Sequence, residues 1–408
     1  MPVRSAVQGV VRLAGRRLPL VSFLARLPAA LCPTGTLLMV TQFGGVARGG
    51  IVAGALWSGQ AVGGPLLGRL ADRRGHRPVV LAASVANALT IVALVLAAVA
   101  RVPLTVQAAC ALLAGFTVPQ IGPLARTRWI ALADRHPEGR ELVGHALAFD
   151  AVVDETSFVV GPALVGILAW AVHPAAGLVC AAVLMAVFGT VFALHPTAPA
   201  AAPRSTRTGR LRPGPLLPLL AMTVLQGVMF GAANTGVQAL ARGDAGVGGL
   251  IWSAMGVTSA TGGFLLATLA ERLDLTTRLR TAMAAQAALT LTLLPVGAAL
   301  GATLSVAAIG IAVAPTLIAL FGLVERITPA DRMGETMTLL GSGLVVGQGL
   351  AVLVAGPLAD RHGYTAAFAL TCGAGGLALL LALALVRPPR YPLRRAAAPQ
   401  VAVGAPAG

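Results

Sequence analysis

The stretch Gly68-Arg-Leu-Ala-Asp-Arg-Arg-Gly-His-Arg77 joins two apolar runs, each of which is long enough to cross a membrane. A short basic turn between two such runs is typical of a cytoplasmic hairpin in a polytopic membrane protein. A weaker copy, Ala267-Thr-Leu-Ala-Glu-Arg272, follows half a chain later. Together the two turns indicate a duplicated protein that lies in a membrane.

The composition excludes an ordinary soluble protein. Of the 408 residues, 57% are hydrophobic and only 11% are charged, and the mean hydropathy is +0.84. Soluble domains carry about 25% charged residues to cover their surface. The surplus of apolar side chains therefore indicates that lipid is the solvent.

The basic residues point to membrane topology and not to nucleic acid. All 30 are arginines, since the chain has no lysine, and they give a net charge of +16. They gather between apolar runs, as do residues that hold loops in the cytosol, so we expect no nucleic-acid partner. Without lysine, the phosphate-binding loop G-x-x-x-x-G-K-[ST] cannot form, and ATP hydrolysis is not expected.

The cysteines give no sign of a metal centre or of catalysis. The four cysteines lie singly inside apolar runs, without the paired spacing of metal ligands or of a disulfide framework. We therefore expect no metal site, and nothing in the sequence calls for a cofactor or for an enzyme.

Twelve apolar segments have about the length that a helix needs to cross a bilayer. They cover residues 18–40, 50–70, 78–100, 104–125, 143–170, 173–194, 215–240, 247–270, 278–300, 302–324, 336–358 and 364–386. The sequence therefore predicts an all-α membrane protein with twelve transmembrane helices.

The distribution of arginines predicts the orientation. With the N-terminus in the cytosol, 25 arginines lie on the cytosolic side, 4 on the opposite side, and Arg26 inside the first span. The positive-inside rule then places both termini in the cytoplasm, and we expect the inner membrane of a bacterium.

A segment rich in proline and arginine divides the twelve spans into six and six. Residue pairs such as Pro119 and Pro315, or Gly161 and Gly356, recur in order at offsets of 195 to 199 residues. This repetition predicts two pseudo-symmetric six-helix bundles. The predicted parts are an N-terminal bundle (1–194), a cytoplasmic linker (195–214), a C-terminal bundle (215–390) and a disordered cytoplasmic tail (391–408).

With these features, the chain resembles the major facilitator superfamily of transporters. The signature of that family between spans two and three is approximately G-x-L-a-D-r-x-G-r-k, and the matching residues are Gly68, Leu70, Ala71, Asp72, Arg73, Gly75 and Arg77. In the family this turn latches the two halves in the outward-facing state, so the resemblance implies that role for Asp72, Arg73 and Arg77. We expect Gly68 to allow a close helix approach and Gly75 to form a tight turn.

A second resemblance concerns the twelve-span drug:proton antiporters of bacteria. Their fifth span carries a Gly-Pro-x-x-Gly-Gly kink, and this chain keeps Gly161, Pro162 and Gly166 of that pattern but has Val165 at the other glycine. The resemblance implies a helix kink at Gly161 and Pro162. The arginine that such transporters place in the middle of the fourth span is absent. Arg126 and Arg128 stand at the cytosolic end of that span instead.

Charged residues inside the predicted spans are few, and they are candidates for proton coupling. A charge at the bilayer centre costs about 2.5–3.5 kcal/mol, so each needs a reason. Arg26, Asp150, Asp154 and Glu155 are placed there. We expect Arg26 to pair with Asp154, with Asp150 or Glu155 as the second carboxylate. Such a cluster can titrate and couple a proton to a substrate, and the alternative is a static ion pair that fixes packing.

The second half offers a polar stripe along its first span. Gln226, Phe230, Asn234 and Gln238 recur every four residues and so share one helix face. In the resembled fold this span lines the central cavity, which makes the stripe a candidate substrate site. Gln120 and Gln348 are weaker candidates of the same type. Buried amides also hold helices together, and that alternative stays open.

The resulting hypothesis is a secondary active transporter that works by alternating access. We expect proton-coupled export of small lipophilic organic compounds, by a monomer with a small-molecule substrate, protons and the lipid bilayer as its partners. A proton-coupled uptake symporter for a small metabolite is the alternative. A rival from another class is a non-transporting polytopic membrane protein, such as a sensor or an embedded enzyme.

Overall fold

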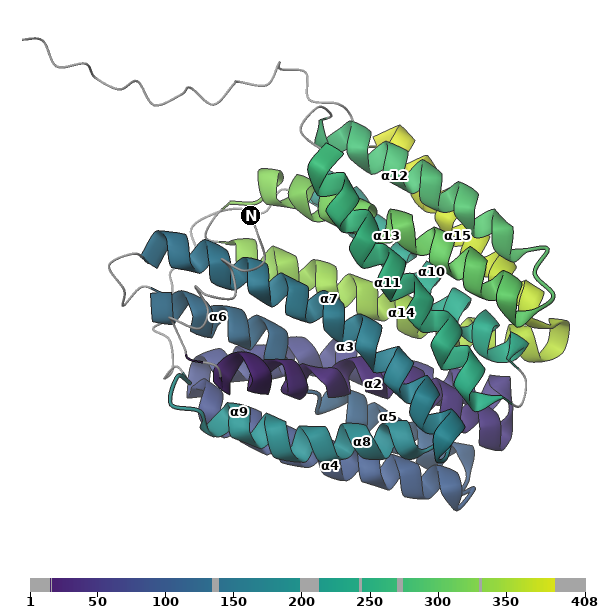
Figure 1. Ribbon diagram of the computed structural model, residues 1–408, viewed down its shortest axis with the longest axis horizontal. Coiled ribbons are helices and arrows are strands. Elements are labelled where there is room, and N and C mark those ends of the chain that lie inside the picture. The colour runs from purple at the N-terminus through teal and green to yellow at the C-terminus, as the bar shows by residue number, and fades with distance from the viewer. Residues whose placement is uncertain are drawn as a thin grey trace, which may run out of the picture.

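The computed structural model describes Gly15 and residues 17–133, 139–198, 213–241, 244–269, 274–329 and 332–385. Within these ranges every regular element is a helix, and the helices form two groups that lie side by side (Figure 1). The predicted tail and most of the predicted linker lie outside the described residues, so the domain boundaries stay a prediction.

The first group follows the first six predicted spans. Its elements are α2 (Arg17–Gly44), α3 (Val46–Arg74), α4 (His76–Val99), α5 (Leu104–Phe116), α6 (Ile121–Ala133), α7 (Gly139–Ala171), α8 (Ala176–Leu184), the π-helical turn η1 (Met185–Gly189) and α9 (Thr190–Leu194). The segments α8, η1 and α9 together occupy the sixth predicted span.

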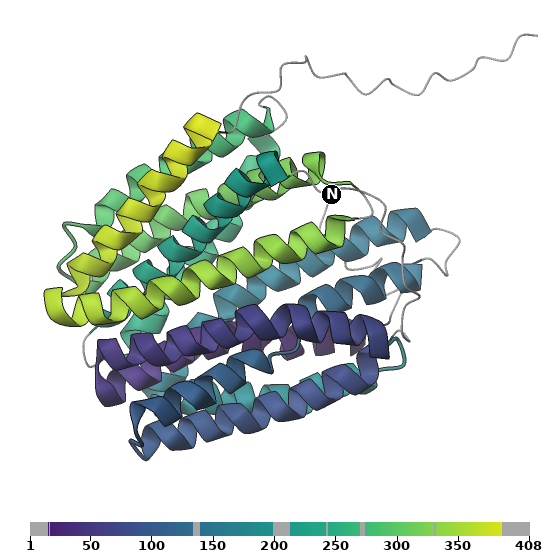
Figure 2. The same ribbon diagram turned by 180° about the vertical axis from the view of Figure 1, so that it is seen from behind.

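The second group follows the last six predicted spans. Its elements are α10 (Pro213–Leu240), α11 (Ala245–Leu269), α12 (Leu275–Thr290) with the 3₁₀ turn η3 (Leu291–Leu293), α13 (Ala299–Ile327), α14 (Met333–His362) and α15 (Tyr364–Leu385). Seen from behind, α14 runs beside α3 of the first group (Figure 2).

Most of these helices are suited to cross a bilayer. Nine segments of the described residues are long and apolar enough to do so, with α5–α6 and α8–α9 each taken as one. The segments outside this set are α3, α11 and α12. Glycines lower the hydropathy of α3, and α2, α5 and α14 pack around it. The all-helical membrane fold is confirmed, while the number of twelve crossings stays a prediction.

The fourth predicted span is two helices instead of one. Pro119 lacks a backbone N–H and disfavours helical geometry in the residue before it, so α5 ends at Phe116 and α6 starts at Ile121. Asn87 of α4 supports the break, since its Nδ2 donates to the carbonyl oxygen of Ala114 at 2.7 Å. The repeat partner Pro315 lies inside α13, which continues through it. The break is therefore a feature of the first half.

The two halves meet along two helix pairs, α3 with α14 and α7 with α11. Glycines bring the backbones together in both pairs: Gly50 faces Gly356, and Gly166 faces Gly249. Such small residues allow the van der Waals contact that holds helices together in lipid. All four glycines lie toward the end of the molecule opposite the basic turn at Gly75, so the halves are closed at that end.

Candidate functional site

Two arginines and two aspartates meet where α2, α6 and α7 pack together. We call Arg26, Arg126, Asp150 and Asp154 the charge cluster. Asp150 and Asp154 lie one turn apart on α7, Arg26 comes from α2, and Arg126 comes from α6. Four ion pairs connect them, since each arginine contacts both carboxylates. The formal charges of the cluster cancel.

Asp150 forms the inner part of the charge cluster. Its side chain is 2% exposed and pairs with Arg26, while Arg126 Nε donates to Asp150 Oδ2 at 2.9 Å. The indole Nε1 of buried Trp129 donates to Asp150 Oδ1 at 3.1 Å. Arg26 also donates from Nη1 to the Asp150 backbone carbonyl at 3.2 Å. Both carboxylate oxygens of Asp150 therefore have partners, and its side chain holds Arg26 and Arg126 in place.

Asp154 forms the outer part. Arg26 Nη1 lies 3.1 Å from Asp154 Oδ1, and Arg126 Nη2 donates to Asp154 Oδ2. The Asp154 side chain is 31% exposed and that of Arg126 is 46% exposed. A Cβ on Gly122 would lie 3.3 Å from Asp154 Oδ1, so this glycine leaves room beside the carboxylate. Asp154 is thus the carboxylate that water or a ligand can reach.

The sequence identified three of the four cluster residues. Arg26 does contact Asp154, and Asp150 is the second carboxylate, while the side chain of Glu155 lies outside the described residues. Arg126 was missed because the fourth span was predicted to end at residue 125. The apolar run that ends at Ala133 shows that helix α6 continues, and this would have placed Arg126 inside it.

The polar stripe of α10 is buried in helix packing. Gln226 is 1% exposed, and its Nε2 has no hydrogen-bond partner. Gln238 Nε2 donates to Asn234 Oδ1 at 3.4 Å, and a Cβ on Gly248 of α11 would meet Gln238 Oε1 at 2.3 Å. Phe230 packs against the apolar core of the second half. The contacts of Gln238 are of the interhelical kind, and a substrate role for the stripe stays a prediction.

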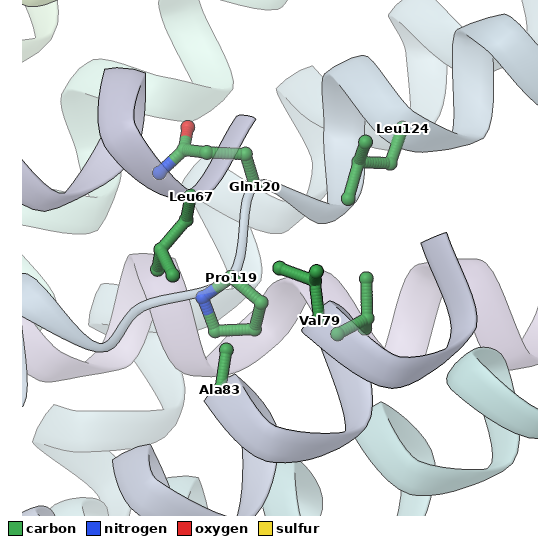
Figure 3. Close-up of a pocket in the computed structure, with 7 residues that line it drawn as sticks. Leu67, Val79, Ala83, Pro119, Gln120 and Leu124 are labelled. Carbon is green, nitrogen blue, oxygen red and sulfur yellow. The ribbon is translucent and has the colours of Figure 1, made fainter. Parts of the chain in front are cut away.

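The two weaker amide candidates lie in different halves. Gln120 follows Pro119 in the α5–α6 break and borders a small hollow with Leu67, Val79 and Leu124 (Figure 3). This hollow has no room for a water molecule, so it holds no substrate in this conformation. Gln348 lies on α14, and its backbone packs against Gly231 of α10.

The residues of the predicted latch lie at the end of α3 and the start of α4. Gly75 ends α3 with a φ of +89°, as expected for a tight turn. Asp72, Arg73 and Arg77 are exposed, and the described part of the chain offers them no hydrogen bond or ion pair. The close approach expected at Gly68 is wrong for this structure, because a Cβ there would meet no atom within 4 Å. Nothing in the described part of the chain packs on Gly68.

The predicted kink residues lie inside a continuous helix. Helix α7 runs through Gly161 and Pro162 to Ala171. A Cβ on Gly161 would lie 2.7 Å from the Cβ of Ala30, so this glycine allows α7 to pack closely on α2. A kink at these positions stays a prediction.

A resident metal has no obvious ligands in the described part of the chain. No group of three or more His, Cys, Asp or Glu side chains comes together there. The four cysteines are free, and Cys32 is buried.

Comparisons with known proteins agree on the fold. The family model described as Major Facilitator Superfamily matches residues 20–339. A search of curated protein sequences gives no match. A crystal structure of the human organic anion transporter MFSD10 aligns with a TM-score of 0.61 at 20% identity, over 90% of this chain and 99% of that one. A bacterial homologue of the iron transporter ferroportin, in its inward-facing state, aligns with a TM-score of 0.69 at 15% identity, over 90% and 98% of the two chains.

A third similar structure is that of the nucleoside transporter NupG. It aligns with a TM-score of 0.66 at 16% identity, over 90% of this chain and 97% of that one. At these identities the likeness concerns the fold and not the transported compound.

Proposed function

Since this chain belongs to the major facilitator superfamily, we propose that it is a secondary active transporter that works by alternating access. The contacts between the halves support this proposal, because they close one end of the molecule and leave the basic turn at the other end free. With both termini in the cytoplasm of a bacterium, as the arginines predict, this is an inward-facing state. The protein then acts as a monomer in the inner membrane.

We propose that the charge cluster couples transport to protons, with Asp154 as the carboxylate that binds and releases them. The observation that carries this proposal is the contrast in exposure between Asp154 at 31% and Asp150 at 2%. A proton can reach Asp154 from the open end. Protonation removes its charge and leaves Arg126 with Asp150 as its only partner in the cluster, which changes the charge balance where α6 and α7 meet.

Asp150 then has a different task. Because it accepts from Arg26, Arg126 and Trp129, it holds both guanidinium groups in place whether or not Asp154 is charged. A buried arginine without a carboxylate partner would be strongly destabilising. Asp150 therefore keeps the cluster assembled while Asp154 exchanges its proton.

We propose that the transported compounds are small lipophilic organic molecules, exported in exchange for protons. The interior of the second half supports this choice, since its buried polar residues in the described ranges are amides and hydroxyls and none is charged. An amide and aromatic surface suits neutral or amphipathic molecules. The first half supplies charged residues and the second half supplies neutral polar residues. A proton and a lipophilic compound can therefore bind to residues of different halves.

One observation favours the second candidate, uptake of a small metabolite together with a proton. Arginines already face both carboxylates, so an anionic group could take the place of Asp154 at Arg126 only after Asp154 is protonated. Proton and substrate would then bind together and travel in the same direction. This mechanism predicts a substrate that carries a carboxylate or a similar anion.

The test is a flux assay in proteoliposomes of known orientation with an imposed pH gradient and a panel of lipophilic cations, neutral compounds and organic anions. Export driven by inward protons supports the first candidate. Uptake of an anion together with protons supports the second. A chain that binds lipid and folds but moves no compound in either direction contradicts both and favours a non-transporting protein.

A further inference from the structure

Arg128 is a buried cation that the charge cluster does not use. It lies on α6 with 0% exposure, and its Nη1 donates to the carbonyl oxygen of Phe192 at 2.7 Å. Its guanidinium carbon lies 3.6 Å from the centroid of the Phe192 ring. Its other two nitrogens, Nε and Nη2, have no hydrogen-bond partner among the described residues. A buried charge with unused donors is costly, so this side chain calls for an acceptor.

His76 brings a second set of unused donors to the same place. It is the first residue of α4, it is 4% exposed, and its Nδ1 has no hydrogen-bond partner. No side chain caps the N-terminus of α4 at Gly75. Val79 and Val80 of α4 pack in one apolar cluster with Trp129 of α6 and Phe192 of α9, so the first turn of α4, with His76, lies close to Arg128.

Among the residues that the structure describes, neither Arg128 nor His76 has a carboxylate within ion-pair distance. Burial, and then the nearby Arg128, lower the pKa of His195. Asp72 of α3 is the carboxylate that interacts with His76, but it is exposed and makes no hydrogen bond or ion pair with the described residues.

We propose that Arg128, His76 and the first turn of α4 bind a phosphate oxyanion, either in a lipid headgroup or as free phosphate. The Nε and Nη2 groups of an arginine form one edge of its guanidinium, and two oxygens of one phosphate fit that edge. A helix N-terminus adds backbone donors and a favourable dipole. His76 Nδ1 supplies a further donor when protonated at that nitrogen.

The depth of the site fits a headgroup. Arg128 is five residues from the end of α6 at Ala133, which is about 8 Å along a helix. His76 lies at the same end of the molecule, and Arg73, Arg74 and Arg77 are exposed beside it. Basic groups between helices at the cytoplasmic end of a membrane protein are well placed for anionic lipid headgroups. This inference is independent of the proposed transport function.

The first experiment uses the purified full chain in a neutral detergent. Its thermal midpoint is measured as inorganic phosphate replaces chloride at constant ionic strength. The midpoint should rise and saturate with phosphate in the wild type and in Arg69→Gln, which alters an exposed arginine of the same turn. In Arg128→Gln the rise of the thermal midpoint should be lost, because the Nε and Nη2 donors that bind two phosphate oxygens are gone.

The second experiment identifies the source of the phosphate and protects the test against misfolding of Arg128→Gln. The wild type and His76→Gln are placed in nanodiscs of phosphatidylglycerol or of phosphatidylcholine, and the thermal midpoint is measured again. Stabilisation by phosphatidylglycerol alone assigns the site to an anionic lipid, and stabilisation by free phosphate assigns it to the inorganic ion. His76→Gln should weaken the apparent affinity about tenfold, since it loses one hydrogen-bond donor to the phosphate. The proposal is overturned if neither phosphate nor phosphatidylglycerol stabilises the wild type, or if Arg128→Gln keeps the full effect.

Discussion

Gly50 of α3 and Gly356 of α14 approach so closely that a Cβ built on either one would lie 2.8 Å from the Cα of the other. Real Cβ atoms essentially never come that near to a backbone atom. Each residue lies toward the end of the molecule where the halves are closed. Even an alanine at either position therefore forces the two helices apart. Such a substitution can test the equilibrium between states that are closed and open at this end.

We expect Gly356→Ala to shift the protein toward a state open at this end, because the new methyl group meets Gly50 and the carbonyl oxygen of Val46 at 3.0 Å. Spin labels at positions 48 and 361, on a background without native cysteines, should report a longer distance. Gly373→Ala is the matched control, since a Cβ there meets no atom within 4 Å. Unchanged label distances in Gly356→Ala would show that the interface is not tight.

The two aspartates of the charge cluster should differ in their effect on stability. Removing one partner of a buried ion pair costs about 3–5 kcal/mol, so Asp150→Asn should lower the thermal midpoint strongly. Asp154→Asn should lower it much less, because Asp154 is 31% exposed. Thermal unfolding of the two variants, compared in one detergent, measures this contrast. Equal losses would contradict the division into an inner anchor and an outer exchange site.

Trp129 should matter through its indole N–H and not only through its ring. A hydrogen bond to a charged group is worth about 1.5–3 kcal/mol, and Trp129→Phe removes the donor that lies 3.1 Å from Asp150 Oδ1. The variant should lose part of its stability, and loss of the ring in Trp129→Ala should add a further, larger cost. If Trp129→Phe unfolds at the wild-type temperature, the indole does not support Asp150.

Asp274 gives a pH-dependent contribution outside the predicted spans. It is the N-cap of α12, and the hydroxyl of Thr277 donates to its Oδ1 at 2.6 Å, while Thr276 N donates to Oδ2 at 3.1 Å. These bonds, that of the Thr277 hydroxyl first, hold the pKa of Asp274 below its usual range. A depressed folded pKa stabilises the fold above the unfolded value of about 3.9, and this stabilisation is lost as the pH falls through the folded value.

Asp274→Ala should therefore destabilise α12 by about 1 kcal/mol at neutral pH and by less in acid. Amide hydrogen exchange at Thr276 and Thr277 follows the loss of the cap. Asp274→Asn keeps a capping oxygen but does not titrate, so its exchange rates should show no such acid dependence. A wild-type cap that is equally protected at every pH would contradict the assignment.

Helix placement could be predicted from the sequence because a bilayer imposes length and hydropathy on each span. The charge cluster could be predicted in part, since Arg26, Asp150 and Asp154 stand out as charges in apolar runs. Arg126 was missed because the fourth span was ended at residue 125, although the apolar residues up to Ala133 continue the helix. The α5–α6 break also escaped, since Pro119 breaks one helix while its repeat partner Pro315 sits in a continuous one. Tertiary support, such as that of Asn87, decides between these outcomes.

The conformation that the structure shows could not be predicted from the sequence. The latch signature predicted a close helix approach at Gly68 that this structure does not show, and the latch role of Asp72 stays a prediction. A sequence pattern reflects the contacts that a protein makes in all of its conformations, whereas one structure shows the contacts of a single conformation. The contact of Gly50 with Gly356 belongs to no motif, and the motif that includes Gly166 did not predict its contact with Gly249; both became visible only in the structure.

The most direct test of the proton-coupling role of Asp154 compares two kinds of flux in proteoliposomes with a transported compound. Asp154→Asn should still exchange labelled for unlabelled compound across the membrane, because this exchange needs no net proton movement. The variant should fail to accumulate or expel the compound when only a pH gradient drives transport. Gradient-driven flux at the wild-type rate, with the wild-type pH dependence, would contradict the account.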